Sequence, residues 1–197
     1  MTKSEIIERQ DITSLLTGLG FSDHFFLTRL KGEQAYERLK SRLQKVAEGN
    51  ALLLNFPLEQ LMDVSFLDET LIRIGEEMAK NQFPQRTLLL QGLTPDTIVN
   101  LNAAIEFRNL KIAFLAVESE GQWQCVGKLE LSLRETLELL WEQSSLTAPE
   151  LSKLKQLAIN SANNRLKRLH DLHLIRRDYQ VSNKGLKYTY YFWNWAV

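Results

Sequence analysis

Three short, uninterrupted apolar runs constrain the fold of this chain more than any other feature. They are residues 51–56 (ALLLNF), 86–91 (RTLLLQ) and 110–117 (LKIAFLAV). Each run has the length of a strand and is apolar enough to be covered on one or both faces of a sheet. The segments between them, 65–80 and 94–107, carry apolar residues at helical spacing. Strands that alternate with helices of this length predict βα units and a largely parallel sheet.

The same alternation extends to both sides of these runs. Residues 1–20 are predicted to form an amphipathic helix, 24–30 a strand, 33–48 a helix and 123–129 a fifth strand. The expected organisation is therefore an N-terminal helical extension at 1–21, followed by an α/β domain at 22–130.

The pattern changes after residue 130. Helices are predicted at 131–141, 147–157 and 161–173, and two strands at 174–181 and 186–195. Thr147 and Glu150 have the spacing of a capping box, and Asn183-Lys184-Gly185 is typical of a hairpin turn. The fold class is thus α/β followed by an α+β domain at 131–197.

Residues 157–177 (LAINSANNRLKRLHDLHLIRR) carry a more specific signal. They resemble the recognition-helix signature of bacterial winged-helix transcription regulators, in which RLKRL, a spacer and LI lead into the wing. The resemblance implies a winged helix-turn-helix over 131–193 that binds duplex DNA. His173 stands where such regulators commonly have Gly, so we expect it to adopt a left-handed conformation.

Within this part, Ala162, Leu166 and Leu169 share one side of the third helix, which leaves polar residues facing outward. Asn pairs well with adenine, and Lys and Arg reach guanine or phosphate. The predicted DNA contacts are Ser161, Asn163, Asn164, Lys167, Arg168, Arg176, Arg177, Lys184 and Lys187.

Charge is divided unevenly along a chain whose net charge is zero. Residues 150–197 hold nine Lys or Arg and three Asp or Glu, a net of +6, whereas the other 149 residues hold 15 and 21, a net of −6. Such asymmetry is typical of a basic part that meets a polyanion, and it also describes two solvated surfaces of opposite sign.

The stretch 51–78 (ALLLNFPLEQLMDVSFLDETLIRIGEEM) has a strand, a loop, Ser65 and a helix in that order. Over about 22–118, the order of elements resembles the STAS fold of bacterial anti-sigma-factor antagonists in a divergent form. The resemblance implies a partner-docking module in which Ser65 is a candidate phosphorylation site. Ser65 with Asp68 is also explained as a helix cap.

Several function classes are disfavoured. The single cysteine, Cys125, excludes an intramolecular disulfide, and no nucleotide-binding, zinc-protease or hydrolase motif is present, so we expect no catalytic set, metal or cofactor. No apolar run approaches the ~18 residues of a membrane span. The charged start MTKSEIIERQ predicts a cytoplasmic protein.

The favoured hypothesis is a bacterial transcriptional regulator that binds duplex DNA and docks or senses a partner through its STAS-like domain. The alternative is a non-enzymatic protein-interaction module that does not bind DNA. A third hypothesis uses the six aromatic residues of 188–195 to stack single-stranded nucleic acid, although packing of this last strand and tail against the domain or a partner chain is the preferred interpretation. We also expect a homodimer, with residues 1–20 or the aromatic tail as the contact.

Overall fold

A computed structural model describes residues 6–19, 25–118, 121–183 and 185–195. Its central sheet contains β1 (Ile7–Asp11), β3 (Ala51–Asn55), β5 (Thr87–Gln91), β6 (Ala113–Val117) and β7 (Trp123–Gly127). The connecting segments hold α1 (Ile12–Leu15), β2 (Phe25–Phe26), α2 (Arg29–Lys45), β4 (Leu61–Met62), α3 (Val64–Leu67), a π-helical turn (Asp68–Ile72), α4 (Arg73–Ala79) and α5 (Pro95–Phe107). The C-terminal part holds α6 (Leu131–Gln143), β8 (Ser145–Leu146), α7 (Ala148–Lys155), α8 (Ile159–Asp171), β9 (Arg176–Ser182) and β10 (Gly185–Tyr191).

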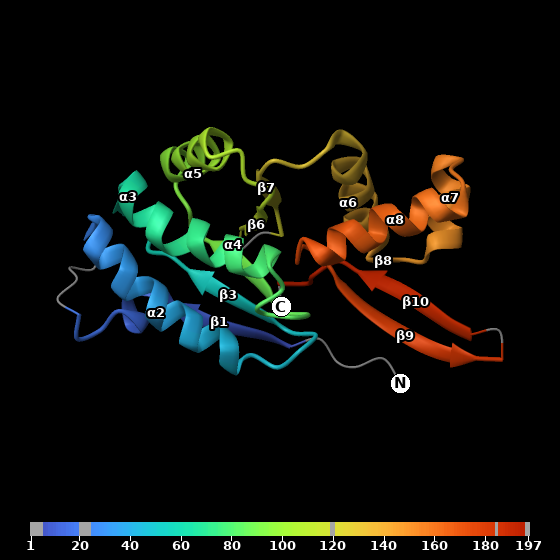
Figure 1. Cartoon of the computed structure of the whole chain (residues 1–197), viewed down its shortest axis with the longest axis horizontal. Coiled ribbons are helices and arrows are strands. Elements are labelled where there is room, and N and C mark those ends of the chain that lie inside the picture. Colours follow the sequence, from blue (N-terminus) through green and yellow to red (C-terminus); the bar gives the residue numbers. More distant parts are fainter. Residues whose placement is uncertain (1–5, 20–24, 119–120, 184, 196–197) are drawn as a thin grey trace.

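The strands of the central sheet lie in the order β1-β3-β5-β6-β7, with the first four parallel and β7 antiparallel to β6. The mixed α/β class with a mostly parallel sheet is confirmed. Each crossover between parallel strands steps in the same direction along the sheet. Because such crossovers are right-handed, the intervening helices gather on one face (Figure 1).

That helical face forms the first of two buried clusters. Alternate strand residues such as Leu52, Leu54 and Leu90 meet apolar side chains from α1 to α5. Packing is close enough to require glycine: a Cβ on Gly75 of α4 would lie 2.8 Å from the Phe114 ring. Strand residues of the opposite parity point to the other face.

The second face is covered by the C-terminal part of the same chain. Leu53, Leu89 and Leu115 share a buried cluster with Leu133 and Leu137 of α6. Core residues of α8 and of the chain after β10 belong to the same cluster. The middle of the sheet is therefore buried on both faces, which explains why β3, β5 and β6 are continuous apolar runs.

The helix predicted over residues 1–20 is wrong at Ile7–Asp11, while residues 1–5 and 20 lie outside the described residues. Ile7–Asp11 forms β1, which pairs in parallel with β3, and only Ile12–Leu15 is helical. Ladder pairing with a distant strand overrides the local pattern here. The strand predicted at 24–30 is reduced to Phe25–Phe26, and helix α2 begins at Arg29.

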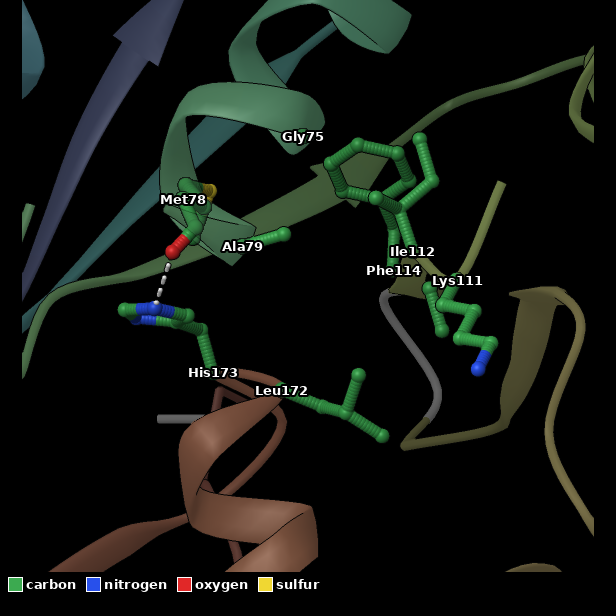
Figure 2. A pocket seen from close by; sticks show the side chains of 9 residues that line it. Gly75, Met78, Ala79, Lys111, Ile112, Phe114, Leu172 and His173 are labelled. Atoms are coloured by element: carbon green, nitrogen blue, oxygen red, sulfur yellow. Dashed lines mark hydrogen bonds between the residues drawn. The ribbon is translucent and has the colours of Figure 1, made fainter. Parts of the chain in front are cut away.

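A buried histidine joins the two parts of the chain. His173 lies in the corner between α8 and β9 at φ 58°, the left-handed conformation expected from the sequence. Its ring nitrogens lie 2.7 Å from the Arg86 carbonyl oxygen and 2.9 Å from the Met78 carbonyl oxygen. Figure 2 shows this ring reaching the end of α4 beside a small gap between the two parts. His173 therefore has an unfavourable backbone conformation, but its side chain contacts the carbonyl oxygens of Met78 and Arg86. A glycine at this position would have no side chain to reach them.

We expect His173→Asn to lower the free energy of unfolding by about 1–3 kcal/mol. Asparagine tolerates the left-handed conformation, but its side chain is too short to contact both carbonyl oxygens. Urea unfolding of the parent and variant measures this difference. His173→Gly relieves the backbone strain and also loses the contacts, and it too should be less stable than the parent. A glycine variant as stable as the parent would contradict a linking role.

Candidate nucleic-acid interface

Helix α8 divides cleanly into a buried side and an exposed side. Ala162, Leu166 and Leu169 are fully buried in the second cluster, as their spacing predicts. The outward positions are exposed: they are Ser161, Asn163, Asn164, Lys167 and Arg168. The packed side fixes the orientation of the helix, so the polar side chains project from a rigid support.

The beginning of α8 has no side-chain cap, since its N-cap position is occupied by Ala158. By contrast, α7 begins with the predicted capping box, in which Glu150 accepts hydrogen bonds from the backbone N–H and the hydroxyl of Thr147, both at 2.7 Å. First-turn N–H groups that no side chain caps are well suited to meet a phosphate. Ser161 lies in this first turn.

Arg168 is held by an acidic residue that the sequence did not point to. Its guanidinium donates two hydrogen bonds to the Glu130 carboxylate, at 2.9 and 2.5 Å. The hydrogen bond from Arg168 lowers the pKa of Glu130, and the same contact raises the pKa of Arg168. Both side chains are more than half exposed, so the pair contributes little to stability and phosphate can compete for the arginine.

The other basic residue of this face, Lys167, is paired within its own helix. Its ammonium lies 2.9 Å from Asp171, one turn further on. Helix α6 adds Arg134 but also Glu135, Glu138 and Glu142, so residues 131–197 carry a net charge of +4 rather than +6. The surface around α8 is thus less basic than the terminal segment alone predicts.

The hairpin β9–β10 separates the remaining predicted contacts. The Arg176 guanidinium lies 4.2 Å from the centre of the Tyr191 ring, and that of Arg177 lies 4.5 Å from the centre of the Tyr188 ring. Strand alternation places Arg176 and Lys187 on the hairpin face opposite Tyr190, whereas Arg177 shares the face of Tyr190. Tyr190 is buried beside His170 of α8. The five predicted contacts on α8 are thus exposed on one helix, whereas Arg176 and Lys187 do not share the helix-facing side of the hairpin. Lys184 lies outside the described residues.

Most of the aromatic tail is not available for stacking bases. Tyr190, Phe192, Trp193 and Trp195 are each at most 6% exposed and belong to the second cluster. Trp195 also donates from Nε1 to the Glu118 carbonyl oxygen (2.9 Å), and its own carbonyl accepts from Arg9 (2.7 Å). The hypothesis of a single-strand stacking surface is therefore wrong for these four residues, because they cover the sheet.

Ser65 does not cap its helix. Asp63 is the cap of α3, accepting a hydrogen bond from the Phe66 N–H at 2.7 Å and another from the Thr28 N–H at 2.9 Å. Ser65 is the second residue of the helix and is half-buried. The aspartate two positions earlier stands at the N-cap position with a charged acceptor and takes the role that the sequence analysis gave to serine.

Other chemistry is sparse among the described residues. No group of three or more His, Cys, Asp or Glu within them has the arrangement of a metal site. Burial raises the pKa of the Cys125 thiol to about 11, which disfavours a nucleophilic thiolate at neutral pH. Within the same part of the chain, no helix is both long and apolar enough to cross a bilayer.

The raised pKa of Cys125 gives a direct prediction. Its alkylation by iodoacetamide should accelerate about tenfold per pH unit between about pH 7 and about pH 9.5 without levelling off, because only the thiolate reacts. The rate is measured by mass spectrometry, with N-acetylcysteine as the reference thiol and circular dichroism to verify that the protein stays folded. A plateau near the ordinary thiol pKa of about 8.5 would contradict a desolvated cysteine.

Comparison with known proteins identifies no relative of this chain. The chain matches no protein-family model and none of the curated proteins. Its function has to be inferred from the placement and chemistry of its own side chains.

Proposed function

We propose that this protein binds duplex DNA through α8 and acts as a transcriptional regulator of the winged-helix type. The observation that carries the proposal is the exposed polar face of α8: two asparagines, a serine and two basic residues on a helix with a buried opposite side. The α/β part, in its STAS-like interpretation, serves to dock or sense a partner, with Ser65 as the candidate switch.

The arrangement around α8 supports this proposal. Helix α7 precedes it across a short turn at 156–158, where Gln156 has φ 52°. With 13 residues, α8 is about 20 Å long, and its exposed face suits a major groove about 12 Å wide. The hairpin projects beyond the helices, away from the central sheet (Figure 1), in the position where a wing would flank the groove.

One observation favours the alternative, a protein-interaction module. The outer half of the hairpin exposes apolar side chains: Tyr179, Val181 and Leu186 are 59%, 78% and 56% exposed. Val181 and Leu186 are paired across the two strands and so form a continuous patch. A patch of this kind suits a protein surface better than a phosphate backbone.

DNA binding is tested by fluorescence anisotropy of a labelled random-sequence duplex between about 50 and about 200 mM salt. We expect micromolar binding at the low end, with a log–log slope of about −0.9 for each phosphate neutralised. Lys167→Ala and Arg168→Ala should each weaken binding and make the slope shallower by about one unit. Arg38→Ala, at an exposed basic position in the middle of α2, is the matched control. No binding at the lowest salt would favour the interaction module.

The Arg168–Glu130 pair provides a second prediction, in which a substitution strengthens duplex binding instead of weakening it. Glu130→Gln should raise the affinity for the duplex several-fold, because it frees Arg168 and removes a negative charge that would face phosphate. Glu106→Gln, which makes the same charge change on the exposed surface of α5, corrects for net charge. Equal effects of the two substitutions would show that Arg168 is not at the interface.

A further inference from the structure

A pocket of about 640 Å³ opens at the carboxyl ends of the parallel strands. Its floor comes from the last residues of β3, β5 and β6, and its walls from the loops that follow β3 and β5 and from the start of α5. Ligands of α/β proteins bind outside the carboxyl ends of their strands, and cavities of this volume hold molecules of drug size. This pocket lies in the N-terminal part and shares no lining residue with α8 or the hairpin.

The walls are held in a defined position. Gly92 follows β5 at φ 81°, and a Cβ there would lie 2.4 Å from the Phe56 carbonyl oxygen, so only glycine lets the two loops approach this closely. Gln60 Nε2 donates to the Gly92 carbonyl oxygen at 2.6 Å, and the Phe56 N–H donates to the Gln91 carbonyl oxygen at 2.9 Å. The pocket is therefore built into the backbone of the two loops.

The chemistry of the lining disfavours anions. None of the residues that line the pocket is Lys, Arg or His, and Glu118 is acidic. The start of α5 offers little to a phosphate: Pro95 has no N–H, Thr94 already accepts from the Thr97 N–H through its hydroxyl, and the Ile98 N–H donates to the Thr94 carbonyl. A bound phosphate would thus lack both a cation and a ring of free N–H donors.

What the lining does offer is an amide side chain beside apolar surface. Gln124 of β7 pairs with Ala116, a residue of the first cluster, so its amide lies on the same side of the sheet as Leu93 and Ile98, which form part of the apolar wall. Asn55 and Gln91 also line the pocket, but they have the strand parity of Leu53 and Leu89 and belong to the opposite face. The Asn55 amide is oriented by a hydrogen bond from its Nδ2 to Asp11 at 2.8 Å. Amide side chains present donors and acceptors together and pair with ligand edges that do the same.

We propose that this pocket binds an uncharged heterocycle with an amide-like donor–acceptor edge, of the nucleobase or nucleoside class, and that it excludes the corresponding nucleotides. The apolar wall contacts the ring system, and the side chain of Gln124 contacts its polar edge. This site is distinct from the nucleic-acid interface, because none of its lining residues belongs to α8 or the hairpin.

The test uses adenosine and uridine as probes and AMP as the charged comparison, each added to the full-length ¹⁵N-labelled protein up to about 10 mM. We expect saturable shifts of the Gly92, Glu118 and Gln124 amides with at least one nucleoside. AMP should bind at least about threefold more weakly than adenosine, since its phosphate finds no cation and meets Glu118.

Gln124→Leu, at an exposed position of β7, should weaken nucleoside binding about three- to tenfold through the loss of a hydrogen bond. Gln34→Leu, on the exposed side of α2, is the matched control and should leave binding unchanged. Thermal unfolding verifies that both variants fold. The proposal is overturned if neither nucleoside shifts these amides, if AMP binds as tightly as adenosine, or if the two variants behave alike. None of these results bears on duplex binding, which is measured separately.

Discussion

Burial of the second face of the central sheet against the C-terminal part is the interaction on which the rest of the structure depends. Because every crossover between the parallel strands steps the same way, the intervening helices cover one face only. The other face presents Leu53, Leu89 and Leu115, which an isolated α/β part would expose to water. Helix α6 and the aromatic tail remove that surface, so the two sequence regions share one core.

This shared core determines which surfaces remain available for binding. The apolar side of α8 faces the core, and His173 joins the corner after α8 to the Arg86 and Met78 carbonyls. The helix is thereby fixed in orientation from two directions. Its polar face and the outer half of the hairpin are left outside, and a rigidly held, exposed helix loses little conformational entropy when it binds a partner.

The sequence was most informative where local pattern and tertiary environment agree. Residues 51–55 and 87–91 are buried on both faces of the sheet. Their local apolar pattern and their tertiary environment both favour a strand. It failed at Ile7–Asp11, whose mixed polar sequence becomes a strand only by pairing with β3, more than 40 residues away. It also missed the partner of Arg168, because Glu130 is 38 positions distant and only the fold brings them together. The aromatic tail is a different case: packing was the preferred interpretation of its residues, and Tyr190, Phe192, Trp193 and Trp195 are buried, but the sequence did not identify the sheet that they cover.

The tail also connects the pocket with the C-terminal part. The Trp195 indole donates to the carbonyl of Glu118, and the Glu118 residue lines the pocket at the end of β6. Trp195 in turn lies against Phe192, whose ring contacts Trp123 of β7, and Trp123 contacts Trp141 of α6. A ligand influences α8 along such a path only if it binds two arrangements of the protein with different affinity. The contact at Glu118 belongs both to the pocket wall and to the hydrogen bond that holds the tail across the sheet, so a variant at Trp195 alters both together.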